Sequence, residues 1–173
     1  MAFTLVINSK GLFGKVKNIQ MAELYNAKRT GRGIFFDGSR IADGQVTISY
    51  NIPTTKTEIR DFIQVAKEIE RQFKKASFYC TEENRNYTID ELENKEEVME
   101  AFSLESLHRF CNDLEMKQCI LTLALYPWFM EPEKREYYKN CPDLDDFEET
   151  IHELQAGDFY YAKPSLMKNK NDG

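Results

Sequence analysis

Hydrophobic and polar residues alternate most clearly over residues 45–52, where Val46, Ile48 and Tyr50 share one face and polar residues share the other. This alternation is typical of a strand with one buried face and antiparallel neighbours. Other β-rich runs predict strands at residues 3–7, 33–36, 77–81 and 159–162. The unbroken apolar run at residues 118–125 predicts a central strand buried on both faces.

Helical spacing dominates after Pro53. Thr55 and Glu58 fit a capping box, and a helix over residues 56–75 is predicted to bury Ile59, Phe62, Ile63, Ala66, Ile69 and Phe73. A second capping box joins Thr88 to Glu91. The remaining helices are predicted at 19–27, at 89–92 resuming over 95–102, from an N-cap at Ser103 to 114, at 132–139, and from Pro142 or Asp143 to Gly157.

Strands come first and are then mixed with helices, and no repeat or linker divides the chain. The fold class that this order predicts is α+β, with an antiparallel or mixed sheet of about five strands and helices packed mainly on one face. We expect one domain over residues 1–164 and a polar tail over residues 165–173. The stretch 82–86 is expected to be a polar loop.

The 173 residues are 42% hydrophobic and 30% charged, as in globular domains. The net charge of −6 is uneven, because residues 1–79 carry +6 and residues 80–162 carry −14. No run approaches the ~20 apolar residues of a membrane helix, and the N-terminus lacks the features of a signal peptide. The four cysteines form no C-x-x-C pair. We therefore expect a cytoplasmic protein with reduced thiols and no membrane partner.

Both histidines follow a glutamate at i, i+3, which gives the pairs Glu105–His108 and Glu149–His152. Di-iron helical bundles use this spacing twice, because a carboxylate and an imidazole three residues apart share a helix face. The apolar stripe of the second helix, however, leaves Glu149 and His152 beside it, towards water. The main interpretation is therefore a pair of solvated histidines. The alternative is a metal-binding protein or enzyme that uses these four residues.

Other catalytic motifs are absent from the sequence. Gly11 to Lys15 lacks the spacing and the hydroxyl residue of a P-loop, and Gly31 to Gly33 lacks the third glycine of a dinucleotide fingerprint. A Cys–His pair is formally available, but buried thiols are usually inert. Cys141, in a loop, is the one thiol to test for reactivity. No cofactor is expected.

Two further stretches concern partners. Residues 10–32 hold six basic side chains and one acidic one, but the overall acidity of the chain argues against nucleic acid. Tyr and Trp favour surfaces that are half apolar and half wet. We therefore name the aromatic stretches as a candidate surface for another protein or for a second copy, with the residues Tyr126, Trp128, Phe129, Tyr160 and Tyr161.

Three segments carry a resemblance to a known family: Gly31–Phe36 before the alternating strand, Pro53–Thr55 at the helix start, and Phe159–Pro164. In these segments the chain resembles small bacterial proteins grouped as a domain-of-unknown-function family. The resemblance implies a bacterial cytosolic protein, with relatives that continue past Pro164, and it brings no activity. From the residues alone, we expect a non-enzymatic module that binds another protein or itself.

Overall fold

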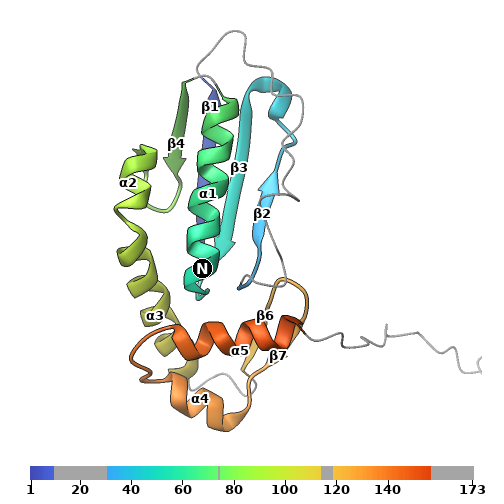
Figure 1. The fold of residues 1–173 in the computed structure, drawn as a ribbon, viewed down its shortest axis with the longest axis vertical. Coiled ribbons are helices and arrows are strands. Elements are labelled where there is room, and N and C mark those ends of the chain that lie inside the picture. Colours follow the sequence, from blue (N-terminus) through green and yellow to red (C-terminus); the bar gives the residue numbers. More distant parts are fainter. Residues whose placement is uncertain (10–30, 74, 114–118, 157–173) are drawn as a thin grey trace, which may run out of the picture.

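The computed structural model describes residues 1–9, 31–73, 75–113 and 119–156. Within them, a five-stranded sheet and a two-stranded sheet are combined with five α-helices (Figure 1), so the predicted α+β class is confirmed. The elements are β1 (Ala2–Ser9), β2 (Ile34–Asp37), the 3₁₀ turn η3 (Ile41–Asp43), β3 (Gln45–Asn51), α1 (Lys56–Gln72), β4 (Ala76–Cys80), β5 (Arg85–Tyr87), α2 (Ile89–Glu93), α3 (Glu96–Asn112), β6 (Ile120–Thr122), β7 (Pro127–Phe129), α4 (Pro132–Tyr138) and α5 (Asp145–Ala156).

The large sheet has the strand order β2-β3-β1-β4-β5, and every neighbouring pair is antiparallel. The edge strand β5 differs from the prediction, because the stretch 82–86 was expected to be a loop. Arg85 and Asn86 are exposed on β5, and Tyr87 alone is buried, opposite Phe78. A short polar strand is typical of a sheet edge, where polar side chains discourage pairing with other chains, and its composition resembles that of a loop.

Helix α1 covers one face of the sheet (Figure 1) and confirms the most clearly patterned helix of the sequence. Its predicted apolar face is buried, at 0–2% exposure for Ile59, Phe62, Ile63, Ala66, Ile69 and Phe73. Phe62 meets the rings of Phe3 and Tyr50 edge-on, with centroids 5.8 and 4.9 Å away. These contacts join the helix to the two strands at the centre of the core.

Ser103 was predicted from the sequence to cap a helix, but it lies inside α3. The helix runs unbroken through it, and the buried hydroxyl instead donates to the carbonyl oxygen of Thr54 and accepts from its N–H, both at 2.7 Å. The Ser103 hydroxyl is thus hydrogen-bonded to the backbone of Thr54, far away in the sequence, and not to the first turn of a helix. The second capping box, between Thr88 and Glu91, is confirmed at the start of α2.

The apolar run at residues 118–125 is not a central strand. Of its described residues, only Ile120–Thr122 form a strand, and they pair with β7 in a separate hairpin. Leu121 and Trp128 point into a second core, whereas the alternate residues are exposed. Trp128 packs there against Tyr138 and Phe147, with ring centroids 6.1 and 6.3 Å away.

Helix α4 matches its predicted range to within one residue, whereas α5 begins at Asp145, after the predicted start at Pro142 or Asp143. Phe147 and Ile151 of α5 are buried as the spacing predicts, and Leu144, just before the helix, is also buried. The predictions at 19–27, 159–162 and 165–173 lie outside the described residues. In the described part of the chain, no helix is both long and apolar enough to cross a membrane.

Candidate functional site

Hairpin β6–β7 presents one apolar face to solvent. Ile120 and Phe129 lie directly opposite each other and are 40% and 61% exposed, and Leu125 in the turn is 41% exposed. The other face of the same hairpin supplies Leu121 and Trp128 to the second core. In the part of the chain that the structure describes, α5 and its neighbours cover only one of the two faces of this hairpin, so the large apolar side chains of the other face lie in water.

A pocket of about 330 Å³ adjoins this face, lined by Leu123, Tyr126, Pro127, Trp128, Phe129, Glu131 and Leu154. Three of the residues named from the sequence as partner-binding are therefore brought together. Their positions differ, since Trp128 is 4% exposed and belongs to the core, Tyr126 is half-buried, and Phe129 is open to solvent. Tyr160 and Tyr161 lie outside the described residues.

The segment Gly31–Arg32 anchors the hairpin to the large sheet. The carbonyl oxygen of Gly31 accepts from the N–H of Ala124 at 3.2 Å and from the side-chain amide of Gln155 at 3.3 Å. The Arg32 guanidinium donates to the carbonyl oxygens of Thr122, at 3.1 Å, and Ile52, at 3.2 Å. These bonds fix the orientation of the exposed face relative to the sheet.

Glu58 is the buried centre of this junction, and it does not complete the predicted capping box. The Thr55 hydroxyl accepts from the Glu58 N–H as expected, at 3.1 Å. The carboxylate, however, accepts from the Gly33 N–H at 2.6 Å and from the Thr54 hydroxyl at 2.5 Å. Burial raises the pKa of Glu58, and these hydrogen bonds oppose the shift.

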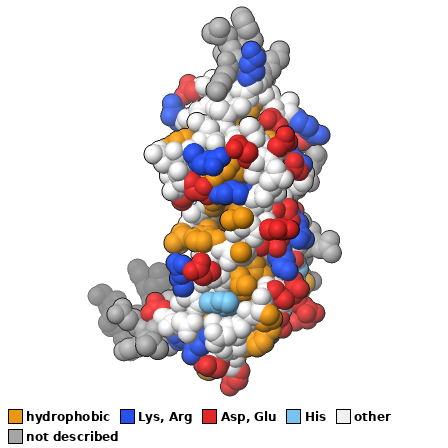
Figure 2. Space-filling view, turned by 90° about the vertical axis from the view of Figure 1, so that its left-hand side faces the viewer, with side chains coloured by type: hydrophobic (Ala, Val, Ile, Leu, Met, Phe, Trp, Pro, Cys, Tyr) orange, Lys and Arg blue, Asp and Glu red, His pale blue; other side chains and the backbone are white. Residues whose placement is uncertain are grey.

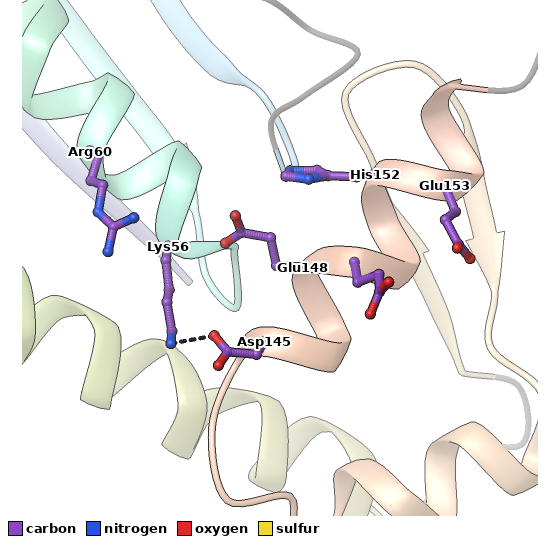
Figure 3. A pocket seen from close by; sticks show the side chains of 7 residues that line it. Lys56, Arg60, Asp145, Glu148, His152 and Glu153 are labelled. Carbon is purple, nitrogen blue, oxygen red and sulfur yellow. Dashed lines mark hydrogen bonds and ion pairs between the residues drawn. The ribbon is translucent and has the colours of Figure 1, made fainter.

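A carboxylate of α5, that of Glu148, caps the first turn of α1 instead. Glu148 accepts from both the N–H and the hydroxyl of Thr57, and Asp145 pairs with Lys56 at 2.5 Å (Figure 3). Acidic side chains are favoured beside a helix N-terminus. Part of the acidity of α5 is thus used inside the protein, in packing α5 against α1.

The Glu149–His152 pair borders this same contact. An open cleft of about 470 Å³ is lined by Lys56, Arg60, Asp145, Glu148, Glu149, His152 and Glu153. Figure 3 shows Glu148 and His152 extending towards α1, while Glu153 lies on another side of α5. His152 is half-buried, and its Nε2 atom is buried without a hydrogen-bond partner among the described residues.

The other pair lies apart from this cleft. Glu105 is exposed and pairs with Arg109, whereas half-buried His108 places Nε2 2.9 Å from the carbonyl oxygen of Cys141. Over the described ranges, no group of three or more His, Cys, Asp or Glu side chains could hold a metal ion. The metal alternative with Glu105, His108, Glu149 and His152 therefore gains no support from the structure.

His108 also brings a Cys–His pair together, with Nε2 3.6 Å from the Cys141 thiol. A neutral ring nitrogen that donates to the Cys141 carbonyl oxygen has no lone pair left to accept the thiol proton. Burial raises the pKa of Cys141, as it does for Cys80, Cys111 and Cys119. The geometry is that of a buried, protonated thiol and not that of an activated nucleophile.

A second apolar surface lies on the side of α2 and α3, where Figure 2 shows hydrophobic side chains between charged ones. Met1, Val98 and Phe102 are 74%, 59% and 37% exposed and line a groove of about 380 Å³. Sequence reasoning missed this groove. The sequence of residues 96–112 did contain a sign of this exposed surface. Its apolar residues are spread around the helix and do not form one stripe, so some of them must lie away from the core.

The fold and its sites define an α+β protein with two cores, a buried polar junction and exposed apolar faces. The family model of a domain of unknown function, DUF4299, matches residues 6–173, so the chain belongs to this family. The resemblance expected from the sequence is thereby confirmed. No curated protein and no solved structure matches the chain.

Proposed function

We propose that this protein is a binding module for another protein and that the exposed face of hairpin β6–β7 is its contact surface. The observation that carries the proposal is the pair Ile120–Phe129, two large apolar side chains opposite each other on the hairpin and both open to water. Contiguous exposed apolar surface beside a pocket marks interaction sites in soluble proteins.

The partner contacts this face through side chains and not by adding a strand. The bonds from the Met130 N–H to Cys119 and from the Leu123 N–H to Tyr126 fix the hydrogen-bonded pairs of the hairpin. By alternation, residues 120, 122, 127 and 129 turn their backbone groups outwards. On the β7 side, Pro127 has no N–H to offer. On the β6 side, Arg32 already occupies the carbonyl oxygen of Thr122. An apolar side chain entering the pocket is the remaining mode.

The charge of this region indicates which charges the partner carries beside its apolar side chain. Residues 119–156 carry nine acidic and three basic side chains, a net charge of −6, and Glu131 stands at the pocket itself. Two copies meeting through this face would oppose like charges, whereas complementary potentials favour association. The partner is therefore a different protein that presents an aromatic or aliphatic side chain flanked by lysine or arginine.

The experiment is a selection of displayed random peptides on the purified full chain. We expect enrichment of peptides with one large apolar residue between basic ones, and loss of their binding in Phe129→Ser. Phe35→Ser is the matched control, because Phe35 is 55% exposed on β2, an edge strand of the other sheet. The proposal fails if Phe129→Ser and Phe35→Ser retain the same peptides. It also fails if light scattering shows a dimer that Phe129→Ser dissociates, since a second copy would then cover the face.

A further inference from the structure

Three sulfur atoms meet in the second core. Cys111 lies on the last turn of α3, Cys119 precedes β6 and Met130 follows β7. The Met130 Sδ atom lies 3.8 Å from the Sγ atom of Cys111 and 3.8 Å from that of Cys119. The backbone bond from the Met130 N–H to the Cys119 carbonyl oxygen, at 2.8 Å, holds two of these residues opposite each other.

The two Sδ–Sγ distances are close to the spacing between ligands around one ion. Metal–thiolate distances are about 2.3 Å in zinc sites, and three sulfur atoms at that distance in a plane lie about 4.0 Å apart. Thiolate and thioether sulfur are the soft ligands that select Cu(I). We propose that Cys111, Cys119 and Met130 form a trigonal site for one Cu(I) ion.

Arg135 supplies the charge that such a site needs. Cu(I) with two thiolates has a net charge of −1, which is costly in an apolar core unless a cation is near. The Arg135 Nε donates to the Cys111 carbonyl oxygen at 2.9 Å. Burial raises the pKa of both Cys111 and Cys119, and the positive charge of Arg135 opposes this shift.

Zn²⁺ fits the site less well. It takes four ligands from thiolates, imidazoles and carboxylates, whereas one of the three sulfur ligands here is a thioether. Over the residues that the structure covers, no group of three His, Cys, Asp or Glu side chains completes such a set. The site also departs from the expectation that the chain needs no cofactor, which rested on the inertness of buried thiols as nucleophiles.

Binding is a proton exchange without a redox step. Burial raises the pKa of Cys111 to about 12 and also raises that of Cys119, which favours the thiol form of each. Cu(I) enters, two S–H bonds break, two Cu–S bonds form, and two protons leave to solvent.

The test is an anaerobic titration of the reduced full chain with Cu(I) in competition with a chromogenic Cu(I) chelator. We expect one ion per chain, and loss of that ion in Cys111→Ser and in Cys119→Ser. Cys80→Ser is the matched control, because Cys80 is equally buried but belongs to the other core. A wild-type chain that takes no stoichiometric Cu(I), or one whose ion survives both substitutions, overturns the proposal.

Met130→Leu is a second test in case the cysteine variants fail to fold. It exchanges side chains of similar volume and should leave the fold intact. We expect it to unfold like the wild type and to give up Cu(I) to the chelator at lower chelator concentration. If the folded Met130→Leu chain gives up Cu(I) at the same chelator concentration as the wild type, Met130 is not a ligand and the three-sulfur site is wrong.

Discussion

Replacing Gly31 with alanine tests the junction that positions the hairpin. A Cβ atom at Gly31 would lie 2.2 Å from the Thr54 hydroxyl oxygen and 3.0 Å from the Thr55 nitrogen. Thr54 cannot move aside freely, because its hydroxyl donates to Glu58 and its backbone bonds twice to the Ser103 hydroxyl. The clash therefore falls on a buried hydrogen-bonded network.

The magnitude follows from two contributions. Overpacking a well-packed site costs about 1–3 kcal/mol, and weakening a buried hydrogen bond to a charged group adds about 1–3 kcal/mol. Gly31→Ala should thus lower the free energy of unfolding by about 2–6 kcal/mol. Trp128, the single tryptophan, is buried in the second core and reports urea unfolding by its fluorescence.

Gly38→Ala is the control, because its Cβ would meet only the ring of half-buried Phe36, at 2.8 Å. That ring can turn away, so we expect a change below about 1 kcal/mol. In a Thr54→Ala background the nearest clashing atom, the Thr54 hydroxyl oxygen, is gone, while the contact with Thr55 stays. Gly31→Ala should then cost at least about 1 kcal/mol less than in the wild type. Equal effects of Gly31→Ala and Gly38→Ala, or strict additivity with Thr54→Ala, would refute the reasoning.

Three further predictions concern stability. Burial raises the pKa of Glu58 above its ordinary value of 4.5, so its contribution to stability is present in acid and is lost as the pH rises through the native pKa. In urea unfolding, the advantage of wild type over Glu58→Gln should therefore shrink as the pH rises above the ordinary value of 4.5, and a constant difference would contradict this. Trp128→Ala should lower the free energy of unfolding by about 3–5 kcal/mol, whereas Phe129→Ser should change it by less than about 0.5 kcal/mol, and similar losses would place both rings in the core. Ile63→Asp puts an unpaired charge at a site that is 2% exposed and should abolish the folded circular dichroism spectrum; a folded variant would show that the assigned face of α1 is wrong.

The elements with strong periodicity were predictable from the sequence alone. Strand β3 alternates strictly between buried and half-buried residues, and α1 buries each residue that its spacing assigns to the core. In both elements one face packs against a single layer, so local pattern and tertiary environment agree. The antiparallel arrangement follows, because half-buried strands belong to such sheets.

The junction was not predictable, because its polar groups find partners far away in the chain. Ser103 and Glu58 each carry a local capping signal, yet they bond to Thr54 and Gly33. The apolar run at residues 118–125 likewise carries no sign that Ile120, Thr122 and Leu125 are exposed to water. Tertiary contacts decide these cases, and they override local preference.

The candidate sites were likewise predictable from the sequence only in part. The aromatic content of residues 126–129 was visible in the sequence, but only the structure separates buried Trp128 from exposed Phe129. Cys111, Cys119 and Met130 are spread over twenty residues of sequence. No spacing motif joins them, because the end of a helix and the two strands of a hairpin bring them together.

Mapping the bound peptide on the protein tests the central claim most directly. Amide NMR shifts of the full chain would be followed during titration with the peptide enriched in the selection. The account predicts that the shifts change at residues 119–131 and at Leu154, and that Phe129→Ser removes the changes while Phe35→Ser keeps them. Changes centred on Val98 and Phe102 instead would move the binding surface to the α3 groove and contradict the account.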